Sequence, residues 1–223
     1  MSEPSPTGRR RGRGARDRIL AAATELFTAQ GINATGMEQL TSVAGVSKRT
    51  LYTHFDGKDA LVHAYLRQLE DGLLPAAEAG DDPRAQLLAV FDGEPPVSDG
   101  PLRGCPFLNA AVEVPDPEHP VHRLAAAYKT EFARRLAVIA RRAGARDPET
   151  LGEQLALLYD GAVARATALN SLSPGAPARD AAALLIDAAV AAPVHEKPCR
   201  HETSNQHETL HQVDTSHQHE APH

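Results

Sequence analysis

The chain has 223 residues, 42% of them hydrophobic, and a formal net charge of −6 at pH 7. A chain of this length buries about 70% of its unfolded surface, which is enough for one or two helical cores. No apolar run approaches the ~20 residues of a membrane-spanning helix, and the arginine-rich N-terminus lacks an apolar signal region, so we expect no membrane partner. Two cysteines are too few for a disulfide framework, which favours a reducing cytoplasm.

The acidic net charge hides a basic N-terminal segment. Residues 1–60 hold nine Lys/Arg and six Asp/Glu, a net charge of +3, which leaves −9 for the remainder of the chain. Six of the nine basic residues lie between Arg9 and Arg18, interrupted by two glycines. We expect residues 1–14 to form a flexible basic arm, which can lie along nucleic-acid phosphates or enter a narrow minor groove. A solvated tail is the alternative.

Residues 35–58 predict two short helices joined by a tight turn. Thr35 and Glu38 have the spacing of a capping box, in which the hydroxyl and the carboxylate each satisfy a free N–H at the helix start. The apolar residues of this first helix fall on one face: Leu40, Val43 and Ala44.

Gly45 supplies the turn, because glycine adopts a positive φ without a Cβ clash. Ser47 is placed to cap the second helix. Val46 and Leu51 have the spacing of a hydrophobic staple, which fixes the angle at which the chain enters that helix. Together these features predict a helix-turn-helix.

The outward side chains of the second helix indicate nucleic-acid binding. Its first turn carries Lys48, Arg49 and Thr50, which in such a helix meet base edges in the major groove. Tyr52 and His54 follow on the same helix, and they can donate hydrogen bonds to phosphate oxygens. An amphipathic hairpin with a merely solvated polar face is the alternative. The residues assigned to DNA contact are Thr35, Thr41, Ser47, Lys48, Arg49, Thr50, Tyr52, Thr53, His54 and Lys58.

From Arg18 to about Val62 the sequence resembles the tetracycline-repressor (TetR) family of bacterial transcription regulators. The residues that carry the resemblance are an Ile19–Phe27 helix, Gly31, Thr35, Gly45-Val46-Ser47, Leu51-Tyr52-Thr53-His54-Phe55 and Lys58. The resemblance implies that the second helix of the motif reads DNA and that Tyr52, His54 and Lys58 touch its backbone. Ile32 departs from the aromatic residue that is common at its position. Beyond about Asp71 the resemblance supports architecture rather than a ligand.

The rest of the chain reads as further helices, with no pattern typical of a strand. Apolar residues recur at helical spacing after Asp56, and proline or glycine separates the later segments. We expect helices over 84–92, 106–114, about 120–143, 148–172 and 176–192. The predicted fold class is therefore all-α: a three-helix helix-turn-helix domain over 15–58, followed by a helical regulatory and dimerisation domain over 59–194.

The last two of these helices carry the stripes from which we predict a homodimer. One stripe comprises Leu155, Leu158, Tyr159, Ala162 and Ala166, and the other comprises Ala182, Leu185, Ile186 and Ala189. Small residues allow close helix approach, so two such pairs can build a four-helix interface. The alternative is that the stripes complete the core of a single chain. A two-fold dimer reads a palindrome with half-sites roughly 34–36 Å apart.

Cys105 and a set of apolar residues mark the predicted regulatory site. Cys105 precedes Pro106, a residue favoured at the first helical position, so positive potential at a helix N-terminus near Arg103 favours the thiolate. Some TetR-type regulators that respond to electrophiles or oxidants look similar here, although free cysteine usually behaves as a small buried hydrophobe. For a ligand cavity we name Phe91, Cys105, Phe107, Leu108, Tyr128, Phe132 and Tyr159, with plain core packing as the alternative.

Residues 195–223 hold seven of the eleven histidines and Cys199 in a polar segment that cannot build a core. We expect a disordered tail; a metal-binding protein that acts through it is an alternative function. A Cys-dependent enzyme that pairs Cys105 with His119 or His122 is another. Neither explains the helix-turn-helix, so we expect no enzyme activity, no cofactor and no dedicated metal site.

The sequence as a whole therefore predicts a DNA-binding transcriptional regulator of the bacterial cytoplasm, associated with the nucleoid. The expected partners are a double-stranded DNA operator, a second copy of the chain, and a small-molecule effector that no sequence feature names. Release from DNA by that effector or by modification of Cys105 is the expected regulation. Repression is favoured over activation by the family resemblance alone.

Overall fold

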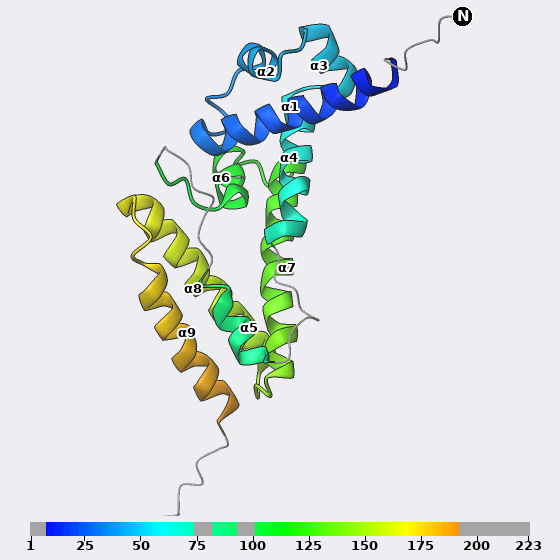
Figure 1. Ribbon diagram of the computed structural model, residues 1–223. Coiled ribbons are helices and arrows are strands. Elements are labelled where there is room, and N and C mark those ends of the chain that lie inside the picture. The colour runs from blue at the N-terminus through cyan, green and yellow to red at the C-terminus, as the bar shows by residue number, and fades with distance from the viewer. Residues whose placement is uncertain (1–7, 74–81, 93–100, 192–223) are drawn as a thin grey trace, which may run out of the picture. The chain divides into compact units, whose positions relative to one another are not determined.

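The computed structural model describes residues 8–73, 82–92 and 101–191, and these residues form helices and connecting turns without a strand (Figure 1). The helices are α1 (Gly8–Gln30), α2 (Met37–Ala44), α3 (Lys48–His54), α4 (Lys58–Leu73), α5 (Pro83–Ala89), α6 (Pro106–Glu113), α7 (Pro120–Arg142), α8 (Pro148–Leu169) and α9 (Gly175–Val190). The predicted all-α fold class is confirmed. Within the described ranges, no helix has both the length and the apolar character needed to cross a membrane.

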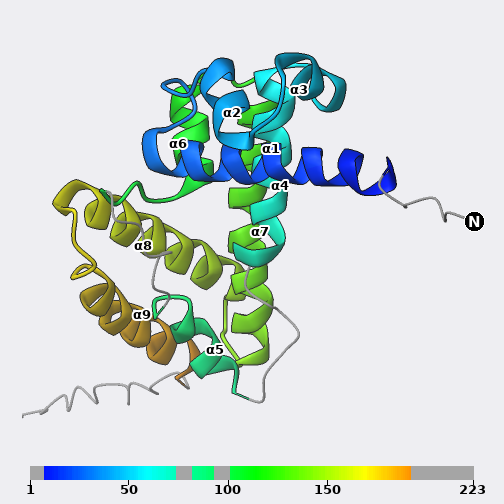
Figure 2. The same ribbon diagram turned by 45° about the horizontal axis from the view of Figure 1, so that its top comes forward.

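The N-terminal helices pack around a small apolar core. In Figure 2, α1 lies across the base of α2 and α3, and α4 leads away from them toward α7. The buried side chains of α1 recur every three or four residues, as in Ile19, Ala23 and Phe27, and they meet Leu40 of α2 and Leu51 of α3. These two leucines are fully buried, so α2 and α3 are held against α1 in a fixed orientation.

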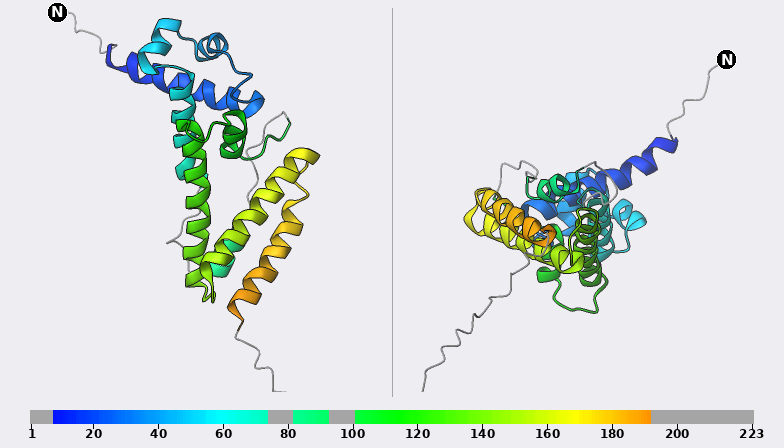
Figure 3. Two further views of the ribbon diagram at one scale, coloured as in Figure 1. Left: turned by 180° about the vertical axis from the view of Figure 1, so that it is seen from behind. Right: turned by 90° about the horizontal axis from the view of Figure 1, so that it is seen from below.

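The long helices α7 and α8 form the centre of the second half of the chain, and α9 packs along α8 (Figure 3). The helices α7 and α8 approach closely at Gly152, where an added Cβ would lie 2.7 Å from the carbonyl oxygen of Ala133 and 2.8 Å from the amide nitrogen of Ala137. From there the two helices diverge toward the C-terminal end of α8, and α6 lies on that side (Figures 1 and 3).

Prolines and polar caps set the helix starts that the sequence predicted. Proline stands in the first turn of α5, α6, α7 and α8. The side chains of Asp82 and Asp147 accept backbone N–H groups at the starts of α5 and α8, and the His119 ring accepts the N–H of Val121 at the start of α7. The observed bounds therefore follow the predicted segments closely.

Two features differ from the expectations. Residues 8–14, assigned to a flexible arm, form the first turns of α1; residues 1–7 and the tail at 195–223 lie outside the described residues. Within the predicted dimer stripes, Leu155, Ala182 and Ile186 are fully buried in their own chain, so they complete its core and cannot meet a partner.

Candidate DNA-binding surface and regulatory site

The turn of the helix-turn-helix has the predicted geometry. Gly45 adopts the left-handed conformation with φ of 60°, and no heavy atom lies within 4 Å of the position that a Cβ would take. The side chain of Ser47 caps α3 by accepting the N–H of Thr50 at 3.0 Å. Val46 and Leu51 both pack into the apolar core, as a staple requires. The start of α3 is therefore fixed on both its polar and its apolar side.

The capping box predicted at the start of α2 is wrong. Gly36 occupies the N-cap position and no side chain caps the helix, while Thr35 is 1% exposed. The Thr35 hydroxyl donates to the carbonyl oxygen of Gly31 at 2.7 Å and accepts from Nε2 of Gln30 at 3.0 Å. A buried hydroxyl cannot reach DNA, so Thr35 acts by holding the turn between α1 and α2. Val43, expected in the core, is 46% exposed.

The remaining predicted DNA residues lie on or next to α3, except Thr41 on α2 and Lys58 at the start of α4, and all are at least partly exposed. Lys48, Arg49, Tyr52 and Thr53 are exposed, whereas Thr50, His54 and Lys58 are half-buried. Four hydroxyls are already engaged within the domain: Thr41 donates to the carbonyl of Glu38, Thr53 donates to that of Arg49, and Thr50 and Ser47 bond each other at 2.8 Å. The long basic and phenolic side chains are thus better placed to reach DNA than the threonines, whose hydroxyls already have partners within the domain.

Sequence reasoning missed three polar contacts that shape this surface. Lys48 Nζ lies 3.1 Å from Oε1 of Glu38, so a carboxylate from α2 holds the first cation of α3. Arg18 donates from Nε to the carbonyl of Ala44 at 3.2 Å, at the end of α2. The Arg16 guanidinium lies 5.3 Å from the ring centre of Phe55. Arg16 and Arg18, which belong to the basic N-terminal segment, therefore also brace the helix-turn-helix.

The aromatic residues proposed for a ligand cavity pack on one another. Phe107 and Tyr128 are stacked with ring centres 3.6 Å apart, Phe132 and Tyr159 are 5.1 Å apart, and Phe91 contacts Tyr159 at 6.2 Å. Burial raises the pKa of Tyr128 and of Tyr159 above the ordinary value for a tyrosine. These five rings form one continuous cluster inside the second half of the chain.

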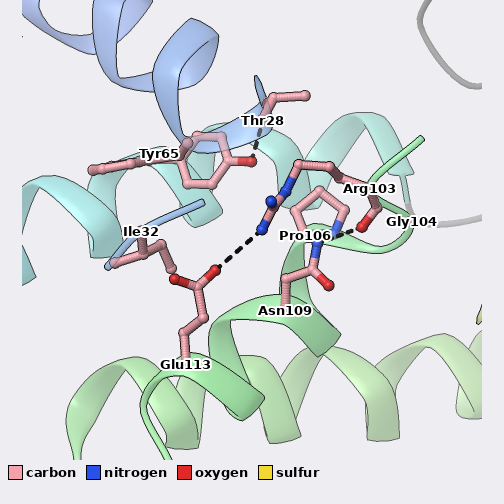
Figure 4. A pocket seen from close by; sticks show the side chains of 9 residues that line it. Thr28, Ile32, Tyr65, Arg103, Gly104, Pro106, Asn109 and Glu113 are labelled. Carbon is pink, nitrogen blue, oxygen red and sulfur yellow. Dashed lines mark hydrogen bonds and ion pairs between the residues drawn. The ribbon is translucent and has the colours of Figure 1, made fainter. Parts of the chain in front are cut away.

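These rings line neither of two cavities that lie beside the cluster, one on each side of the start of α6. The larger, of about 320 Å³, lies between α6 and α8 and is lined by Cys105 and Leu108, together with Val112 and Val163. The smaller, of about 20 Å³, lies between α6 and the N-terminal helices, where Thr28 and Tyr65 form part of its wall (Figure 4). Four residues line both cavities: Arg103, Gly104, Asn109 and Glu113.

Comparison with known proteins assigns the fold and the surface to a family. Residues 19–65 match the sequence model of bacterial regulatory proteins of the tetR family. The chain is 33% identical to a TetR-family transcriptional regulator of known structure from Streptomyces coelicolor, over 80% of this chain and 97% of that one, with a TM-score of 0.73. The chain belongs to the TetR family. It is accordingly a DNA-binding transcription regulator, and not an enzyme.

Curated relatives match shorter stretches. The transcriptional regulator TcmR of Streptomyces glaucescens is 34% identical over 114 residues, which are 45% of this chain and 50% of TcmR. The regulator RutR of Escherichia coli is 40% identical over 72 residues, which are 32% of this chain and 34% of RutR. The chain thus spans half the length or less of these curated relatives.

In this TetR-family chain, the residues shared by the two cavities also touch the DNA-binding domain. Glu113 accepts the backbone N–H of Asn33 on Oε2 at 2.6 Å, and its carbonyl accepts Nδ2 of Asn33 at 3.1 Å. Its Oε1 lies 3.6 Å from Nη2 of Arg103 (Figure 4). Gly31 lies against this pair: its φ is +93°, and an added Cβ would come within 2.6 Å of Arg103 and 2.8 Å of Glu113.

The histidines weighed as partners of Cys105 bond elsewhere. Nε2 of His119 lies 3.2 Å from Oδ2 of Asp59, and Nδ1 of His122 bonds the carbonyl of Val114 at 2.8 Å. Among the described residues there is no group of three or more His, Cys, Asp or Glu side chains placed to hold a metal. The histidine-rich tail lies outside those residues.

Proposed function

We propose that this TetR-family regulator is a homodimeric repressor that binds a palindromic operator and leaves it when an effector binds or when Cys105 is modified. The observation that carries the proposal is the exposed face of α3, where Lys48, Arg49 and Tyr52 project from a helix whose start is fixed by the Ser47 cap. Such a surface suits the major groove, with the first turn at the base edges.

The roles of individual residues follow from their place on α3 and, for Lys58, at the start of α4. Lys48, Arg49 and Thr50 occupy the first turn and contact bases, whereas Tyr52, His54 and Lys58 contact phosphates. Lys48 must release Glu38 before it reaches the bases. Breaking this ion pair costs little free energy, because both side chains are largely exposed to solvent. This regulator acts in the bacterial cytoplasm, on the nucleoid.

The dimer surface lies on the outward faces of α8 and α9. Leu157 of α8 is 71% exposed and Leu184 of α9 is 73% exposed, and both are large apolar side chains. Gly161 and Ala164 are exposed on the same helix as Leu157, and small residues let a partner helix approach closely. A four-helix interface between two copies would cover these apolar side chains.

DNA binding by substituted proteins tests the function. Lys58→Ala is expected to weaken binding to an operator and to unrelated DNA alike, and to flatten the dependence of log affinity on log salt by about one unit per half-site. Tyr52→Phe should likewise weaken binding to all sequences, because it removes one phosphate contact. Arg49→Ala should instead relax base preference, by about 1–3 kcal/mol at the affected position.

The measurement is operator selection with purified protein, followed by fluorescence-anisotropy titrations at several salt concentrations. Arg123→Ala provides the matched control, because it removes an exposed cation that pairs with Glu118 and belongs to α7 rather than to α3. Specific binding that is undiminished in the double variant with Tyr52→Phe and Lys58→Ala would contradict the assigned surface.

A further inference from the structure

Arg103 and Glu113 form an incomplete ion pair at the wall between the two cavities. Their closest atoms are 3.6 Å apart, which is too long for a hydrogen bond. Nε of Arg103 and Oε1 of Glu113 are both buried, and neither has a hydrogen-bond partner among the described residues. Buried polar groups normally have a partner, so this pair is poised to accept one.

The larger cavity can supply the room for such a partner. Its volume of about 320 Å³ lies within the range of roughly 300–1,000 Å³ that is usual for small-molecule sites. Most of its wall is apolar, as at Leu108, Val112 and Val163, and its polar side chains are those of Arg103, Asn109, Glu113 and Thr167. A mostly apolar wall with few polar groups favours a ligand with an apolar body and one polar end.

The charges around the cavity favour a negative polar end. Glu113 uses Oε2 on the backbone N–H of Asn33 at 2.6 Å, which anchors its carboxylate at the DNA-binding domain and leaves Oε1 facing Arg103. Within the described ranges, the Arg103 guanidinium makes no hydrogen bond to a carboxylate. The N-terminus of α6 adds positive potential on the same side, since its N-cap residue Cys105 makes no capping bond with its side chain.

We propose that the cavity between α6 and α8 binds the effector, and that the effector is a small, mostly apolar molecule with a carboxylate that Arg103 binds. This inference rests on the proposed function, because it names the ligand class of the regulator's effector. Arginine suits the role because its planar guanidinium can meet both carboxylate oxygens at once.

The same pair gives the bound carboxylate a route to the DNA-binding domain. A carboxylate at Arg103 competes with Glu113, whose side chain holds Asn33 and lies against Gly31 at the end of α1. An effector acts only if it binds one state of the protein better than another. Here Arg103 faces Glu113 in one state and the bound ligand in the other. The contact that Glu113 makes at the end of α1 changes with that choice.

Matched probe pairs test the ligand class without DNA. Isothermal titration would measure binding of decanoate and of 2-naphthoate against decanamide and 2-naphthamide. Wild type should bind at least one carboxylate at least tenfold more tightly than its amide. Arg103→Gln should lose this preference, whereas Arg103→Lys should keep part of it because the charge remains.

Glu113→Gln separates a binding role for Arg103 from a merely structural one. Its amide oxygen still accepts the N–H of Asn33, and removal of the competing carboxylate should make carboxylate binding about threefold tighter or more. Loss of a structural ion pair would weaken binding in both Arg103→Gln and Glu113→Gln. Arg123→Gln, which changes an exposed arginine of α7, should bind like wild type, and thermal unfolding would verify that each variant is folded.

The results decide between the inference and the function on which it rests. The inference is overturned if neither carboxylate binds wild type, if each amide binds as well as its acid, or if both members of the pair weaken binding when substituted. Operator binding is titrated separately. Carboxylate binding without specific DNA binding would overturn the proposed function and leave the site, and the reverse result would overturn the site alone.

Discussion

The hydroxyl of Thr35 ties the end of α1 to the start of α2. It donates to the carbonyl of Gly31 at 2.7 Å and accepts from Nε2 of Gln30 at 3.0 Å, in a position that is 1% exposed. Gln30 also donates to Oε1 of Gln39 on α2 at 2.7 Å. The turn that sets the angle between α1 and the helix-turn-helix therefore depends on one buried side chain.

Thr35→Val is expected to destabilise the fold by about 1–3 kcal/mol, because it keeps the shape of the side chain and leaves the carbonyl of Gly31 without its donor. Thr35→Ser keeps the hydroxyl and loses only a methyl group, so it should cost about 1 kcal/mol. Urea unfolding followed by circular dichroism measures both. A valine variant at least as stable as the serine variant would show that the hydroxyl does not hold the turn.

At the scale of single residues, sequence predicted roles where the cause is local and missed them where it is not. The Ser47 cap and the positive φ of Gly45 depend on neighbours within three residues, and both are as expected. Thr35 and Glu38 fit a capping box equally well by spacing. Instead, contacts to Gln30 and Lys48 determine what they do, and no spacing along α2 reveals those contacts.

Together with α4, α6 links the two halves of the chain. Phe107 is fully buried and stacks on Tyr128 of α7, while Cys105 at its N-cap lines the larger cavity. Before it, Gly104 adopts a φ of +68°, and an added Cβ would lie 2.5 Å from Oγ1 of Thr167 on α8. A group attached to the Cys105 thiol would occupy space between α6 and α8.

Alkylation of Cys105 is therefore expected to lower operator affinity by tenfold or more. N-ethylmaleimide adds bulk at the start of α6, and the close-packed side chains around Phe107 cannot rearrange locally to make room, so α6 must shift as a whole. The measurement compares operator affinity before and after treatment in wild type, Cys105→Ser and Cys199→Ser. Wild type and Cys199→Ser should respond and Cys105→Ser should not. An equal response in all three, or none in any, would leave Cys105 as a plain packing residue.

At the scale of elements, the bounds of the later helices were predictable because proline and glycine mark their ends. The cavities between these helices were not predictable. Phe107, Tyr128 and Phe132 were placed around a cavity from their apolar character, yet their rings stack on one another. The pattern of apolar residues identifies which faces turn inward, whereas the gap left between packed helices depends on the angle at which they cross.

For the whole molecule, burial shifts the expected dimer interface by one residue along each helix. Leu158 and Leu185, chosen from the sequence stripes, pack partly against their own core. Their neighbours Leu157 and Leu184 are 71% and 73% exposed. When apolar residues cover two neighbouring faces of a helix, they form one stripe in the sequence. Only the packed structure separates the face that packs on its own chain from the face that is free for a partner.

Leu157→Glu and Leu184→Glu are therefore each expected to convert a dimer into a monomer at micromolar concentration, because each would bury an uncompensated charge at an apolar interface. Neither change touches the protomer core, so helicity by circular dichroism should stay as in wild type. Sedimentation velocity measures the assembly state.

Val43→Glu provides the matched control, since it introduces the same charge at an apolar residue of α2 that is 46% exposed and distant in sequence from α8 and α9. Dimers that persist in both leucine variants, or that dissociate equally in the control, would place the interface on another surface. A monomeric variant that still folds should also bind a single half-site and lose the gain in affinity that a second, linked half-site provides.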